Sequence, residues 1–164
     1  MTEVGQTGAE PGRSGSRAQV GELEVPGGGT SVVGHVRHWA GGTVRRWHPD
    51  EHLVSTAALL VGELVTNALL HGLPPVRLRL RSAAGRLSIE VFDRGDLLPD
   101  RGRVGPEDES GRGLLMVEVL ADGWGSRASA PGKVVWAELP LPGAVGVGED
   151  RDRGQDQAPD QDRP

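Results

Sequence analysis

The chain has 164 residues, a length typical of one domain with additional chain at its ends, and it lacks cysteine, which excludes disulfides, thiolate metal sites and thiol nucleophiles. Of its 18 basic residues 17 are Arg, and Lys133 is the one Lys. The net charge of −5 comes entirely from residues 1–24 and 143–164, and the balanced charge of residues 25–142 argues against a nucleic-acid binder that works through bulk positive charge.

The two ends of the chain are polar and have few apolar residues. Residues 1–21 are rich in Gly, Ser, Glu and Gln, and residues 143–164 in Asp, Gln, Arg and Pro. Such segments bury too little apolar surface to offset the entropy of ordering, so we expect two disordered tails around one domain at 22–142. The first tail has no apolar signal region, and no stretch reaches the ~20 apolar residues that cross a bilayer, so we expect a cytoplasmic protein without membrane contact.

The first elements of the domain are predicted to be a short strand and two helices. Thr30 or Ser31 is expected to cap the first helix and Asp50 the second, because such side chains accept hydrogen bonds from free amides at a helix start. The strand is expected at Leu23–Val25, and the first helix is expected to end at about Trp47. The second helix is expected to end at about His71, just before Gly72. Its buried face is predicted to consist of Ala57, Val61, Leu64 and Ala68.

The second half is predicted to hold a hairpin, a helix and two further strands. Apolar residues alternate with Arg over Val76–Arg81 and with polar residues over Arg86–Asp93, and Ala84-Gly85 turns between them. A helix capped by Ser110 is expected to reach about Leu120, and the last strands are expected at Trp124–Ala128 and Val134–Leu139. The order predicts an α+β fold, a two-layer sandwich in which one mixed or antiparallel sheet carries helices on one face.

Three polar residues lie one turn apart on the second predicted helix. Glu63, Asn67 and His71 share one face, and the apolar residues lie on another. An amide oxygen is a good ligand for Mg²⁺, and a carboxylate can orient water or a hydroxyl group. The alternative is a solvated polar stripe without a ligand.

Two clusters that contain glycine offer further contacts for a ligand. Asp93 ends a strand and Gly95 follows, so the carboxylate can accept from an adenine amino group while the glycine lets a ligand approach the backbone. Gly111 and Gly113 open the last helix, whose free amides favour an anion. The alternatives are an ordinary turn and an ordinary capped helix. The second cluster matches neither the Walker loop nor the Rossmann fingerprint.

In this order, the three clusters resemble the N, G1 and G2 boxes of the GHKL superfamily, the histidine kinase-like ATPases with the Bergerat fold. Within it, Glu63–Gly72, Glu109–Val117 and Gly132–Leu139 are most similar to the anti-sigma-factor serine/threonine kinases of Gram-positive bacteria, in particular to actinomycete proteins. The resemblance covers residues 25–140. It implies a GHKL-type sandwich, ATP and Mg²⁺ as cofactors, and an ATP lid at residues 96–110.

The resemblance also implies a role for each polar residue. Glu63 corresponds to the catalytic base or water-orienting carboxylate, Asn67 to the Mg²⁺ ligand, and Asp93 to the residue that recognises adenine. Arg37, on the first predicted helix, corresponds to a residue that faces a protein partner, with a merely solvated side chain as the alternative. The remaining residues implied to contact the nucleotide are His71, Gly95, Gly111, Arg112 and Gly113.

Two positions depart from the pattern of these relatives. The family's Asp-x-Gly-x-Gly is reduced to Asp93-Arg-Gly95-Asp-Leu97, and Val134 stands where relatives often have Thr. Both changes concern the expected affinity for ATP more than the fold. No dimerisation domain of a histidine kinase and no transducer domain is recognisable, so we expect neither an autophosphorylating histidine kinase nor a topoisomerase.

The activity that the resemblance implies is transfer of the γ-phosphoryl group of ATP to a serine of an antagonist (anti-anti-sigma) protein. Such a regulator of transcription can also bind a sigma factor, and the resemblance suggests a homodimer. One alternative is a non-catalytic module that uses ATP to shape a partner-binding surface, against which the presence of Glu63 argues. The other is a degenerate domain without nucleotide, against which Asn67 and Asp93 argue.

Overall fold

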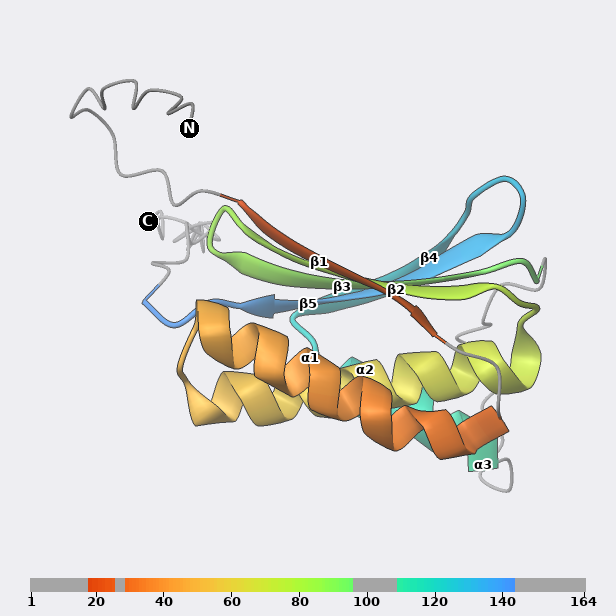
Figure 1. Cartoon of the computed structure of the whole chain (residues 1–164), viewed down its shortest axis with the longest axis horizontal. Coiled ribbons are helices and arrows are strands. Elements are labelled where there is room, and N and C mark those ends of the chain that lie inside the picture. Colours follow the sequence, from red (N-terminus) through yellow and green to blue (C-terminus); the bar gives the residue numbers. More distant parts are fainter. Residues whose placement is uncertain (1–17, 26–28, 96–108, 144–164) are drawn as a thin grey trace, which may run out of the picture.

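An antiparallel sheet forms one layer of the fold, and helices cover one of its faces (Figure 1). The computed structural model describes residues 18–25, 29–95 and 109–143, with the side chains of 109–112 left out; most of the predicted tails and of the lid lies outside this range. The five described strands follow the order β1-β2-β3-β5-β4. The elements are β1 Gln19–Val25, a 3₁₀ turn at Gly29–Val32, α1 Val33–Trp47, α2 Glu51–His71, β2 Val76–Ala83, β3 Arg86–Asp93, α3 Glu109–Leu120, β4 Gly123–Ala128 and β5 Lys133–Pro140. The predicted α+β sandwich is confirmed, with an antiparallel rather than a mixed sheet.

The start of the domain differs from the prediction in two respects. β1 begins at Gln19 rather than Leu23, because it pairs with β2 along its whole length. The predicted caps at Thr30 and Ser31 are wrong: both residues lie in the 3₁₀ turn, and the N-cap of α1 is Val32, which makes no side-chain cap hydrogen bond.

Helix α2 is the central element of the core. Its predicted N-cap is confirmed, because the amide of Leu53 donates to Asp50 Oδ1 at 2.7 Å, and the helix ends at Gly72 as expected. By length and composition α2 would be apolar enough to cross a membrane, with a mean hydropathy of 1.7, but 56% of that apolar window is buried inside the fold. Its apolar character is therefore accounted for by the core, to which all four predicted residues belong: Ala57, Val61, Leu64 and Ala68.

The hairpin of β2 and β3 carries the chain to the end of α2. Ala84 and Gly85 have φ values of 51° and 75°, as in the two-residue turns whose twist matches that of the flanking strands. After β3, the amide of Arg94 donates to the carbonyl of Leu73 at 2.8 Å, which joins the end of this strand to the loop that follows α2. Asp93, the last residue of β3, is thereby placed beside the C-terminus of α2.

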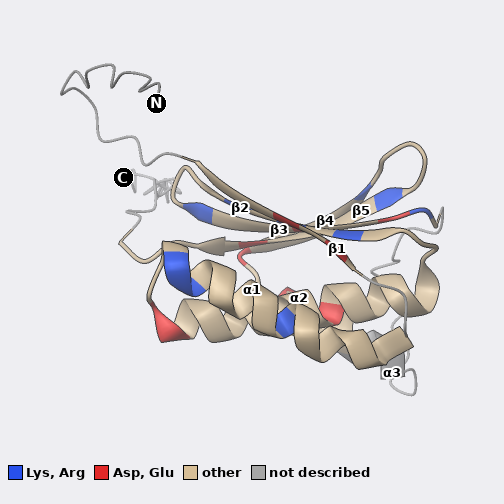
Figure 2. Ribbon diagram, viewed as in Figure 1, with Lys and Arg blue, Asp and Glu red and all other residues tan. Residues whose placement is uncertain are grey.

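The last helix and strands complete the two layers. α3 begins at Glu109, so Ser110 lies inside the helix rather than at the predicted cap position. α3 packs against α2 on the covered side of the sheet, and charged residues are few and scattered along the helices (Figure 2). On the open side, Trp136 of β5 lies across Gly125 of β4, where an added Cβ would be 3.0 Å from the indole.

Candidate functional site

A hollow of about 260 Å³ lies between the C-terminal half of α2 and the beginning of α3. The three polar residues predicted to share a face of α2 all line it, together with Gly113 of α3. Its volume falls just below the ~300–1,000 Å³ of typical small-molecule sites. The lining residues are Glu63, Thr66, Asn67, Leu70, His71, Gly113 and Leu114.

The Glu63 side chain reaches across this hollow to α3. A Cβ added to Gly113 would lie only 2.5 Å from Glu63 Oε2, so the carboxylate lies against the helix backbone at a point where a side chain would obstruct it. This close approach explains why a glycine suits position 113. Gly111 and Arg112 lie in the same first turns of α3, but their side-chain environment falls outside the described part of the chain.

Asp93 does not line the hollow, because its side chain is completely buried. Its two carboxylate oxygens have different surroundings. Oδ1 accepts a hydrogen bond from the amide of Gly95 at 2.7 Å and lies 3.2 Å from Lys133 Nζ. Oδ2 has no hydrogen-bond partner among the described residues, and neither has Lys133 Nζ, whose approach to Oδ1 is an ion pair without hydrogen-bond geometry.

Glycine backbone encloses the Asp93 carboxylate. A Cβ added to Gly72 would lie 2.4 Å from Asp93 Cγ, and one added to Gly95 would lie 2.8 Å from Oδ1. Gly72 directly follows His71, so the enclosed carboxylate lies just beyond the His71 end of the hollow. At both glycines a side chain would therefore collide with the carboxylate, which explains why residues without a Cβ lie against it.

Lys133, the cation paired with Asp93, has no role in the predictions made from the sequence. Lys133 is the first residue of β5 and lies directly opposite Asp93 in the register with β3. Its side chain is 2% exposed, which is rare for a lysine unless it is paired. The signal available in the sequence was that a chain with 17 Arg has a single Lys, at the start of an apolar strand.

Arg37 is an exposed residue of α1 and does not line the hollow. Its aliphatic stem crosses Gly62 of α2, where an added Cβ would lie 2.8 Å from Arg37 Cδ. The stem thus takes part in the contact between the two helices while the residue as a whole stays exposed. Its predicted contact with a protein partner stays a prediction.

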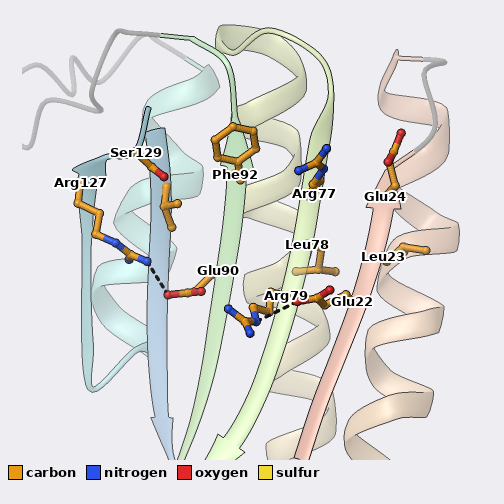
Figure 3. A pocket seen from close by; sticks show the side chains of 11 residues that line it. Glu22, Leu23, Glu24, Arg77, Leu78, Arg79, Glu90, Phe92, Arg127 and Ser129 are labelled. Carbon is orange, nitrogen blue, oxygen red and sulfur yellow. Dashed lines mark hydrogen bonds and ion pairs between the residues drawn. The ribbon is translucent and has the colours of Figure 1, made fainter. Parts of the chain in front are cut away.

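A second and larger hollow, of about 560 Å³, lies on the open face of the sheet (Figure 3). None of the predicted site residues lines it. Its charged side chains largely pair with one another: Arg127 with Glu90 at 2.8 Å and Arg79 with Glu22 at 3.1 Å. Arg77 lies 5.9 Å from the centre of the Phe92 ring. This face therefore offers no excess charge for a nucleotide, and the smaller hollow beside α2 is the better candidate.

A metal site made by protein ligands alone is absent from the described residues, where no group of three or more Asp, Glu or His side chains could hold an ion. The predicted role of Asn67 does not require such a group, because one protein ligand can suffice when an ion keeps its remaining bonds to phosphate oxygens and water. Mg²⁺ is commonly bound in this way, through one or two side chains and the phosphates of a substrate.

Comparison with known proteins identifies one family. The model of the histidine kinase-like ATPase domain matches residues 30–139. Two structures of the Erythrobacter litoralis EL346 blue-light activated histidine kinase are each 19% identical to the chain. The structure of its histidine kinase domain has a TM-score of 0.46, and the match covers 70% of this chain and 62% of that one. The other structure has a TM-score of 0.44, and the match covers 75% of this chain and 47% of that one. The chain thus spans less than two thirds of either, and the likeness concerns the fold alone. No curated protein matches the chain.

Proposed function

The chain belongs to the family of histidine kinase-like ATPase domains, and from this premise we propose that it binds ATP with Mg²⁺ at the hollow between α2 and α3 and phosphorylates a serine of an antagonist protein. The observation that carries the proposal is the grouping of Glu63, Asn67 and His71 with Gly113 in one cavity. The match at residues 30–139 includes all of them.

The residues around this hollow fit both cofactors. The Asn67 amide oxygen suits Mg²⁺, and the first turns of α3 suit phosphate oxygens because helix N-termini favour anions. The buried Asp93 Oδ2, which has no hydrogen-bond partner among the described residues, suits the amino group of adenine. When bound, Mg²⁺ would neutralise charge on the β- and γ-phosphates.

Glu63 is the residue we assign to the chemical step. It lies one turn before Asn67 on the same face of α2, so its carboxylate would be next to phosphates held through that residue. A serine oxygen of the partner would attack the γ-phosphorus while its proton passes to Glu63. The bond from that phosphorus to the β–γ bridging oxygen breaks, and ADP leaves. Such transfer needs positioning and charge neutralisation more than covalent chemistry by the protein.

The regulatory role follows from the resemblance of the three boxes to anti-sigma-factor kinases. In this proposal the partners are an anti-anti-sigma antagonist and a sigma factor, and the Arg37 region of α1 contacts one of them. The protein acts in the cytoplasm, where it can form a homodimer. The second candidate is a module that binds a partner under control of ATP without phosphorylating it. Incubating a partner recovered from the native host with γ-labelled ATP separates the two, because only a kinase transfers the label.

We expect ATP to bind in a Mg²⁺-dependent manner and at least ~10-fold more tightly than GTP, because guanine would leave a buried polar group unsatisfied. Calorimetric titration of the full chain with each nucleotide, with Mg²⁺ or with EDTA, measures both effects. Equal affinity for ATP and GTP would contradict the role assigned to Asp93, and no affinity for either would contradict the proposed function.

Asn67→Ala is expected to weaken Mg²⁺·ATP binding by roughly tenfold or more, as removal of a group that supports a metal commonly does. The expected loss is confined to Mg²⁺-dependent binding, so the residual affinity in EDTA should match that of the wild type. His52→Ala, at an exposed position on the same helix outside the hollow, is the matched control. An Asn67→Ala variant that binds Mg²⁺·ATP as the wild type does would remove Asn67 from the metal site.

A further inference from the structure

Within the described part of the chain, the ion pair of Lys133 and Asp93 leaves two buried polar atoms without hydrogen bonds. These atoms are Lys133 Nζ and Asp93 Oδ2, and neither has a partner among the described residues. Buried polar groups are nearly always hydrogen-bonded, because leaving one unsatisfied in a low-dielectric interior is costly. A donor and an acceptor left unsatisfied on neighbouring side chains indicate that a further polar group belongs between or beside them.

The partners of Asp93 Oδ1 explain why Oδ2 is the free oxygen. The Gly95 amide donates to Oδ1, and Lys133 Nζ lies on the same oxygen at 3.2 Å. The register of β3 with β5 places Lys133 directly opposite Asp93, so the strand pairing itself maintains this arrangement. Lys133 therefore holds one carboxylate oxygen and leaves the other available.

We propose that Lys133 is a positioning and specificity-determining residue of the nucleotide site, and that it reads the base together with Asp93. Asp93 Oδ2 accepts from an exocyclic amino group, and Lys133 Nζ donates to a ring nitrogen beside that group. Adenine offers this combination, since its amino group lies next to ring-nitrogen acceptors, whereas guanine has a carbonyl oxygen at the corresponding position. The inference rests on the proposed function, because it assumes that a nucleotide binds.

The simpler alternative is that the pair only joins β3 to β5. That role would make Lys133 indifferent to the nucleotide. The base-reading role requires the environment of the Lys133 side chain to change when a base arrives, since Lys133 and Asp93 are both buried in this structure. The two roles therefore differ in a property of the wild-type protein and can be separated without any mutation.

The single lysine of the chain makes this measurement direct. Full-length protein labelled with ¹³C at lysine Cε has one lysine side-chain resonance, that of Lys133. We expect this resonance to shift on saturation with ATP or with adenosine, and to stay in place with Mg²⁺ and inorganic triphosphate. A resonance that stays in place while calorimetry reports ATP binding would overturn the inference and leave the proposed function intact. A shift with triphosphate alone would also overturn it, because Lys133 would then contact phosphate. If calorimetry detects no ATP binding, both proposals fail.

A variant supplies the second test. Lys133→Met keeps the length of the side chain but removes its charge and donors, and we expect the preference for ATP over GTP to fall by about tenfold, as expected for one lost buried hydrogen bond. Affinity for inorganic triphosphate should stay unchanged, which a general disturbance of the fold would not allow. A folded Lys133→Met protein with the wild-type ATP-to-GTP ratio would overturn the inference. If the variant does not fold, the lysine resonance of the wild-type protein decides.

Discussion

Replacing Glu63 with Gln is expected to lower phosphoryl transfer to the captured partner by ~10²-fold or more while leaving the affinity for ATP nearly unchanged. Gln keeps the shape and hydrogen bonding of the side chain but cannot accept the serine proton as a carboxylate does, and loss of a general base has an effect of this size. Because Glu63 Oε2 lies so close to Gly113, a side chain of the same size is needed to preserve the contact between α2 and α3. The measurement pairs calorimetry of ATP binding with the transfer rate of labelled phosphate.

Glu118→Gln is the matched control for this experiment. Glu118 is an exposed residue of α3 that does not line the hollow, so the same chemical change there should affect neither binding nor transfer. If Glu63→Gln transfers phosphate at the wild-type rate, Glu63 has no catalytic role. If the wild type transfers none to any captured partner and yet ATP changes its affinity for that partner, the non-catalytic module is the correct function.

The second large effect concerns stability. Lys133→Met is expected to lower the free energy of unfolding by about 3–5 kcal/mol, because it leaves the Asp93 carboxylate buried without a counter-charge. Most of this loss should be recovered in the double variant Lys133→Met/Asp93→Asn, since replacing both members of a buried ion pair by neutral groups is often close to neutral. Urea denaturation followed by circular dichroism gives the free energies of all three proteins.

An exposed ion pair on the same sheet provides the comparison. Arg127 of β4 pairs with Glu90 at 2.8 Å, but the Arg127 side chain is 52% exposed, so Arg127→Met should cost at most about 1 kcal/mol. A Lys133→Met variant as stable as Arg127→Met would mean that Lys133 and Asp93 do not form a buried charged pair. The same reasoning bears on any test of adenine recognition, because Asp93→Ala would leave Lys133 buried and unpaired and would disturb folding as well as binding.

The parts of the fold that were predicted correctly depend on local patterns. Asp50 caps α2 because the acceptor and the amide it serves are three residues apart, and the alternation before and after Ala84-Gly85 defines the hairpin without reference to the rest of the chain. The errors arose where a partner element decides the outcome. The first half of β1 is a strand because it pairs with β2 through Glu22 and Arg79, among others, and the 3₁₀ turn before α1 has no local signal distinct from a helix cap.

In the candidate site, too, local spacing predicted some features correctly, whereas features that depend on a distant element were missed. Spacing along one helix is enough to place Glu63, Asn67 and His71 on one face, and the structure brings all three to one hollow. Gly113 forms the opposite wall of the hollow because α3 packs against α2. The order of the motifs indicated this packing only through the resemblance to a known family. The pairing of Asp93 with Lys133 depends on the register of two strands forty residues apart in the chain, and no local pattern reveals such a register.

The glycines around Asp93 also limit how this sequence can change in evolution. At Gly72 and Gly95 even a methyl group would collide with the carboxylate, and Gly132, with a φ of 152°, would bring one within 2.1 Å of the Asp93 carbonyl oxygen. Gly95 thus becomes free to vary only after the aspartate side chain has shortened or disappeared. Gly132 and Gly72, where an added Cβ would also lie 2.5 Å from the Ala68 carbonyl oxygen, are held by the backbone whatever side chain stands at 93. In lineages that abandon nucleotide binding, substitutions should therefore appear at 93 first and at 95 afterwards, while 72 and 132 stay glycine, and this order would mark when the site was lost.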